Sequence, residues 1–116
     1  MPNIRFMNWN IEKLSGNKVA IPGVVANLGR VIVNANADVV IILEVAQVSG
    51  AAAMAALSAA ANAASIAAGG AATDFTGWFL SYHTGGERYG FLIKNMNMVR
   101  PVHVTAGPAG APPAAA

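Results

Sequence analysis

The first third of the chain shows two patterns of hydrophobic and polar positions, the first typical of a strand and the second of a helix. Residues 4–11 alternate apolar with polar, which is typical of a strand that buries one face. Residues 15–17 are Ser, Gly and Asn and predict a loop. Apolar residues then recur at helical spacing over 24–32, and Pro22 stands near the first helical position, where its missing N–H does no harm. We therefore expect a strand, a loop and a helix in this order.

Residues 39–45 form a nearly unbroken apolar run that predicts a strand buried on both faces. A strand, helix and strand in succession form a βαβ unit, so this strand should run parallel to the first. Glu44 lies near its end, where an unpaired charge would be costly. A bound cation would compensate that charge, and ligands usually bind at the carboxyl ends of such strands. Glu44 is therefore our predicted metal ligand; the alternative is a carboxylate that reaches solvent or a nearby Lys.

The second half begins with an alanine-rich helix, predicted from its N-cap Ser49 to about Ala68, with Gly69 and Gly70 as its stop. Its large apolar anchors are Met54, Leu57 and Ile66. Three further strands are predicted over 78–83, 88–94 and 98–104, as an antiparallel meander that continues the sheet. The Pro, Gly and Ala residues of 106–116 indicate a linker or tail.

Composition changes this picture in one respect. Hydrophobic residues make up 55% of the chain and charged residues only 10%, against a usual charged share of about 25%. We therefore expect the protein to bury part of its surface against another chain or segment. The net charge of +2 permits a polyanionic partner without arguing for one, and the absence of cysteine excludes a disulfide framework and a thiolate metal site. No secretory signal or membrane span is predicted, and the compartment stays open.

Three segments, taken in order, carry a resemblance to a known family. They are Asn8-Trp9-Asn10-Ile11, the run over 38–45 that contains Glu44, and the segment over 87–93 that begins with Glu87. Together they resemble the endonuclease/exonuclease/phosphatase superfamily, which has the fold of DNase I. The resemblance implies that residues 1–105 are the N-terminal half of a four-layer α/β/β/α sandwich, of class α/β (α+β), with a mixed sheet that carries its helices on one face.

The resemblance also implies an activity and a site. Members of the family hydrolyse phosphoesters with a divalent cation, usually Mg²⁺ and alternatively Mn²⁺ or Ca²⁺. Glu44 matches the metal-ligand glutamate, Asn10 the asparagine that supports the scissile phosphate, and Glu87 the glutamate that orients a catalytic histidine. A hard cation suits oxygen ligands and often takes only one or two carboxylates beside substrate phosphate and water. The substrate class is a phosphoester, with nucleic acid as one possibility.

The departures from the family concern its second half. The chain ends before the family's central Asp and Asn pair and its closing Asp-His motif, so Glu87 has no partner histidine here. Gly85, Gly86 and Ala46 stand where DNase-like members carry minor-groove Tyr and Arg, which weakens a DNA-specific reading. Half a sandwich would expose an apolar sheet face to water. We therefore expect a complementing C-terminal half as a second chain, or self-association. The alternative function is a catalytically incomplete scaffold that associates through this face.

Each candidate residue also has a plain structural interpretation. Asn10 could cap a turn, Glu87 could be a solvated turn residue, and Asn8 is structural by default. Glu12 and Lys13 are expected to be solvated charges after a strand. The remaining polar candidates are expected to be structural rather than catalytic: His83, His103 and Asp74.

Overall fold

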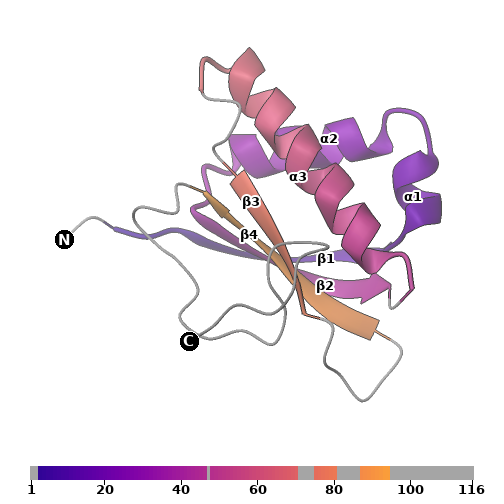
Figure 1. Cartoon of the computed structure of the whole chain (residues 1–116). Coiled ribbons are helices and arrows are strands. Elements are labelled where there is room, and N and C mark those ends of the chain that lie inside the picture. The colour runs from indigo at the N-terminus through magenta and orange to yellow at the C-terminus, as the bar shows by residue number, and fades with distance from the viewer. Residues whose placement is uncertain (1–2, 47, 71–74, 81–86, 95–116) are drawn as a thin grey trace.

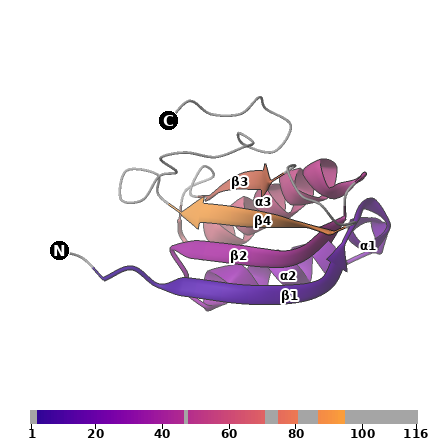
Figure 2. The same ribbon diagram turned by 90° about the horizontal axis from the view of Figure 1, so that it is seen from below.

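The computed structural model describes residues 3–46, 48–70, 75–80 and 87–94. In these residues the chain is a small α+β domain with a mixed four-stranded sheet and three helices. Its elements are, in chain order, β1 (Phe6–Leu14), α1 (Gly16–Ala20), α2 (Val24–Asn34), β2 (Val39–Ala46), α3 (Gly50–Ala67), β3 (Phe75–Leu80) and β4 (Glu87–Lys94). The helices lie on one face of the sheet (Figures 1 and 2). The predicted α+β class, mixed sheet and one-sided helices are confirmed.

The strands lie in the order β1-β2-β4-β3. β1 and β2 are parallel, as the βαβ prediction requires, with Met7 opposite Val40. The expected meander is wrong in one respect, because β4 and not β3 pairs with β2, antiparallel to it. A central strand has a hydrogen-bonded neighbour on each side, and both central strands here carry an apolar run. β4 supplies such a run over 91–93, and Leu92 and Ile93 are both buried.

Several element boundaries differ from the sequence-based expectation. β1 extends to Leu14, and the loop expected over 15–17 is the start of α1. Ser15 is the N-cap of α1, because its Oγ accepts a hydrogen bond from the Lys18 backbone N–H at 3.2 Å. β3 begins at Phe75, earlier than predicted. The strand expected over 98–104 and the tail expected over 106–116 lie outside the described residues.

The core lies between the sheet and the helices. Leu14, Ile32, Ile42 and Leu57 are fully buried, and each such side chain contributes about 1.5–3 kcal/mol. Of the anchors predicted in α3, Met54 and Leu57 are buried, whereas Ile66 is 53% exposed. Buried alanines take the place of a third large anchor in this helix: Ala53 and Ala61.

α3 is held close to its neighbours by small residues. A Cβ on Gly29 would stand 2.6 Å from the backbone carbonyl of Ala60, so α2 and α3 touch through their backbones at this point. α3 also meets the length and mean hydropathy, 1.4, of a membrane-crossing helix. Its packing against α2 and β3 accounts for that apolar composition in the fold. Ser49 stands at the predicted N-cap but makes no capping bond, because its Oγ accepts from the Gly16 N–H at 2.8 Å.

The sheet face opposite the helices is largely apolar. Side chains alternate along a strand, so the neighbours of the core residues in β1, β2 and β4 point to this face. We define the outer sheet face by its accessible apolar members: Phe6, Ile41, Leu43, Tyr89 and Phe91. Phe6 is 68% exposed, Tyr89 is 44% exposed and the other three are partly exposed, while Val39 and Ile93 on the same face are buried. Burial of such a surface against another chain or segment, which the composition predicts, stays a prediction.

Candidate functional site

Strand register brings the three predicted site residues to one edge of the sheet. Asn10 in β1 is adjacent to Glu44, since it pairs with the preceding residue of β2, Leu43. Glu87 begins β4 and pairs with Ala46, at the same end of β2. This edge is the carboxyl end of the parallel pair β1 and β2, where open α/β sheets usually bind their ligands. We refer to it as the carboxyl edge, meaning the end of the sheet at which β1 and β2 finish and not the lateral edge formed by β1 or β3.

Glu44 lies in a β-bulge rather than in a regular strand. The β2–β4 register shifts between Ile42 and Val45, and Glu44 has a left-handed backbone with φ of 58°. Its side chain is partly buried, so the expectation of a strand buried on both faces is wrong at this residue. The bulge changes the direction of the carboxylate without requiring a charge inside the core. A left-handed backbone is uncommon for a residue other than glycine, and such strain often marks functional sites.

Asn10 forms a turn within β1, where the register with β2 begins to shift. Its Oδ1 accepts a hydrogen bond from the Glu12 backbone N–H at 2.8 Å, which matches the plain structural interpretation. Glu12 and Lys13 are exposed, as expected, and both are left-handed, with φ of 62° and 65°. The turn occupies only the oxygen of the Asn10 amide. Its Nδ2 has no partner among the residues that the structure describes and remains available as a donor.

Lys18 donates hydrogen bonds to this turn, a role that the sequence analysis missed. Its Nζ donates to the Ile11 carbonyl at 2.5 Å and to the Glu12 carbonyl. Two carbonyl oxygens therefore receive a charged donor from α1, the short helix that Ser15 caps. The sequence shows only that Lys18 follows Lys13 by five residues. This spacing does not distinguish a lysine that hydrogen-bonds within the fold from one that is solvated.

Arg88 is a second residue that the sequence analysis missed. It stands opposite Val45 in the register and is only 7% exposed, an unusual burial for a guanidinium. It is engaged in an interaction within the structure. Its neighbour Glu87 is placed by its backbone alone, and its side chain lies outside what the structure describes, as do His83, His103 and Asp74.

The carboxyl edge offers a partial ligand set for a divalent cation. Among the described residues no three His, Asp or Glu side chains are grouped closely enough to hold a metal ion. Glu44 and one additional carboxylate would still suffice for Mg²⁺ when phosphate and water supply the other oxygens. The Asn10 Nδ2 could then donate to a phosphate oxygen. The arrangement fits metal-assisted phosphoester chemistry that other groups would have to complete.

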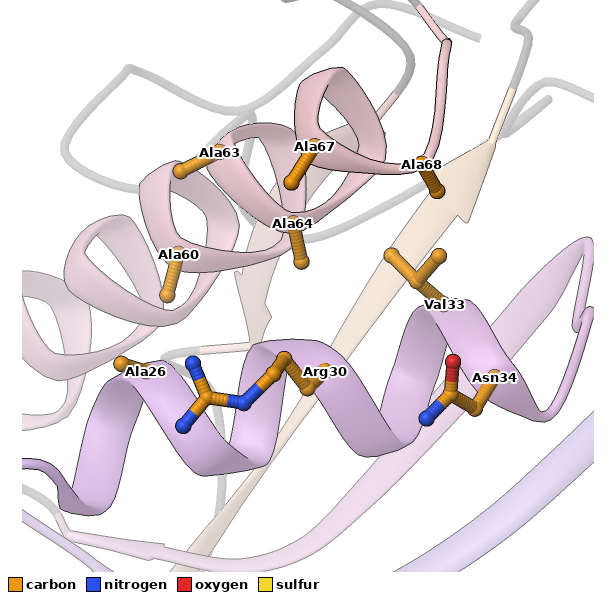
Figure 3. Close-up of a pocket in the computed structure, with 9 residues that line it drawn as sticks. All are labelled: Ala26, Arg30, Val33, Asn34, Ala60, Ala63, Ala64, Ala67 and Ala68. Atoms are coloured by element: carbon orange, nitrogen blue, oxygen red, sulfur yellow. The ribbon is translucent and has the colours of Figure 1, made fainter.

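A groove elsewhere in the fold does not belong to this edge. It lies between α2 and α3, has a volume of about 350 Å³ and is lined mainly by alanines, with Arg30 as its charged member (Figure 3). The Arg30 guanidinium donates to the Asn27 side-chain oxygen on its own helix. Neither the groove nor Arg30 adds a carboxylate or an imidazole to the candidate site.

Comparisons with protein-family models, with curated proteins and with solved structures find no match for this chain.

Proposed function

We propose that this chain is the metal-ligand half of a divalent-cation-dependent phosphoester hydrolase of the endonuclease/exonuclease/phosphatase type. Glu44 holds Mg²⁺, Asn10 donates to the scissile phosphate and Glu87 orients an imidazole from the complementing half. The observation that carries the proposal is the convergence at the carboxyl edge. The strand register puts the backbones of Asn10, Glu44 and Glu87 toward the same end of the sheet, and Glu12, Lys13 and Glu44 have left-handed backbones there.

The orientation of the sheet supports the need for a second half. Asn10 is exposed and alternates with the core-facing Trp9 and Ile11, so it shares the face of Phe6 and Ile41. A second sheet packed on that face would form the remaining layers of an α/β/β/α sandwich. It would also bring its own residues beside Asn10 and Glu44. In this proposal one packing event covers the apolar surface and completes the site.

Metal binding by the chain itself tests the proposal. We would titrate Mn²⁺ into ¹⁵N-labelled protein, because this paramagnetic ion broadens amide signals near its site. We expect the strongest broadening at residues 10–13, 42–46 and 87–88, which the strand register puts at the carboxyl edge. Glu44→Gln removes the charge and keeps the shape, and should abolish the effect. Glu12→Gln, which removes an exposed carboxylate at the same edge, is the matched control and should bind Mn²⁺ as the parent does. Broadening that survives Glu44→Gln would refute the ligand role.

Activity is tested in the complete assembly. With the complementing half present, Glu44→Ala should lower metal-dependent phosphodiester cleavage by at least the roughly 10 to 100-fold known for changes behind the metal ligands. Unchanged cleavage would remove Glu44 from the mechanism.

A second function, a catalytically incomplete scaffold, is favoured by a different observation. The outer sheet face is apolar and accessible, as a binding surface would be. In this alternative the face binds a partner and the carboxyl edge is inert. A purified complex whose second chain brings an Asp-His motif and cleaves phosphodiesters would exclude the scaffold. A partner unrelated to the family, with no Mn²⁺ binding at Glu44, would favour it.

A further inference from the structure

One edge of β3 is unpaired among the described strands, and neither proposed function uses it. β3 pairs with β4 on one side, and no strand in the described part of the chain pairs with its other side. Its sequence, Phe-Thr-Gly-Trp-Phe-Leu, contains neither a charged residue nor a proline. Natural sheets usually protect an edge with lysine, proline or a bulge, because open backbone groups recruit further strands.

The side chain of Asn62, in α3, hydrogen-bonds to the backbone of this edge. Its side-chain Nδ2 donates to the Phe75 carbonyl at 3.1 Å, and its Oδ1 accepts from the Phe75 N–H at 2.7 Å. One carboxamide thus makes the pair of hydrogen bonds that a neighbouring strand would make. Both backbone groups of Phe75 therefore point away from β4. Antiparallel strands alternate in this respect, so the backbone groups of Gly77 and Phe79 also point outward.

The outward groups open into a groove beside α3. It has a volume of about 340 Å³ and is lined by small or neutral residues: Ala55, Ser58, Ala59, Asn62, Phe75, Thr76 and Gly77. Ala55 and Ala59 are exposed on the helix flank. A Cβ on Gly77 would lie 3.2 Å from Ser58, so glycine lets α3 pack closely over the strand. The groove accepts a neutral extended backbone with no charge to match.

We propose that a second copy of this chain occupies the groove, through antiparallel pairing of the two β3 edges. With the two-fold axis at residue 78, Gly77 of each copy lies opposite Phe79 of the other, and each pair exchanges both hydrogen bonds. β3 is itself an uncharged strand with outward backbone groups at these positions, so it is complementary to its own edge. Asn62 ends the pairing at Phe75 and so limits it to a closed dimer. This association is independent of the phosphoesterase proposal, since β3 and β1 are opposite edges of the sheet.

The oligomeric state of the full chain tests the proposal, by light scattering over a range of concentrations. The parent should form a dimer. Ala59→Lys places a charge in the groove, keeps a residue of similar helix propensity and should weaken the dimer at least tenfold. Ala63→Lys changes another exposed alanine of α3, in the groove shared with α2, and should leave the dimer intact. A parent that stays monomeric, or an Ala59→Lys dimer as tight as the parent, would overturn the proposal.

Amide hydrogen exchange identifies the surface used. The amides of Thr76 and Trp78 face β4 and should be protected at every concentration. Those of Gly77 and Phe79 should become protected only as the dimer forms. A dimer in which Gly77 and Phe79 exchange as fast as in the monomer would have formed through another surface, such as the outer sheet face, and would overturn β3 pairing.

Discussion

At the residue scale, the candidate site depends on backbone geometry that is supported by side chains elsewhere in the fold. Glu12 and Lys13 adopt left-handed backbones near the C-terminal end of β1, and strain of this kind persists only where neighbouring groups enforce it. The Asn10 oxygen supports the turn from one side and the Lys18 ammonium from another. The position of the Asn10 amide should therefore depend on Lys18.

Lys18→Met tests this dependence, since methionine keeps the aliphatic stem and removes the charged donor. Hydrogen bonds from a charged group contribute about 1.5–3 kcal/mol, so the variant should lose stability of this order in urea unfolding. Lys13→Met is the matched control, because Lys13 is exposed and makes no side-chain bond among the described residues. It should change the free energy of unfolding by less than about 0.5 kcal/mol. Equal losses in both variants would contradict a specific role for Lys18.

The sequence predicts which residues reach the site better than it predicts how they are held there. Asn10 and Glu44 lie near the C-terminal ends of two predicted parallel strands, and strand periodicity therefore places both toward the same end of the sheet. The bulge at Glu44 is not predictable in this way, because it arises from the register between β2 and β4, which are separated by the whole of α3. The Lys18 contact likewise depends on a short helix that pattern analysis treats as loop.

At the element scale, α2 and α3 approach each other most closely at a glycine. Gly29→Ala would place a methyl group 2.6 Å from the Ala60 carbonyl, and this neighbour is helix backbone that cannot rotate away. Overpacking of this kind costs about 1–3 kcal/mol, which the gain in helix propensity, about 1 kcal/mol, offsets only in part. We expect a net loss of stability in thermal unfolding.

Val31→Ala is the control for this substitution. Val31 lies on the same helix and is 44% exposed, so its change should stay within about 0.5 kcal/mol of the parent. A Gly29→Ala variant as stable as the parent would mean that α2 and α3 can separate at little cost.

Elements with strong periodicity were predictable, and their arrangement was less so. The helix at 24–34 and the strand at 39–46 follow their apolar patterns closely. The insertion of β4 between β2 and β3 did not follow, because the choice of neighbour depends on contacts between segments far apart in the sequence. Local sequence predicts whether a segment forms a helix or a strand, whereas packing in the whole sheet decides which strands become neighbours.

At the scale of the whole molecule, the low charge content of the chain is visible in the apolar outer sheet face. The helices cover one face of the sheet (Figure 2), and the aromatic and aliphatic side chains on the other retain contact with water. Each apolar Å² removed from water contributes about 25 cal/mol, so a partner on this face would gain appreciable binding free energy. Both proposed functions require that gain, since the hydrolase and the scaffold each use this face for assembly.

A dye that fluoresces on apolar surfaces tests whether the outer sheet face is accessible in the native protein. The folded chain should bind anilinonaphthalene sulfonate without denaturant. Ile41→Thr with Leu43→Thr should reduce the signal at least twofold, because each change replaces an apolar side chain with one that carries a hydroxyl. Threonine is β-branched and therefore suits a strand. Ile66→Thr removes an exposed apolar residue from α3 and should leave the signal unchanged. Equal signals from all three proteins would place the dye elsewhere and leave both functions without their assembly surface.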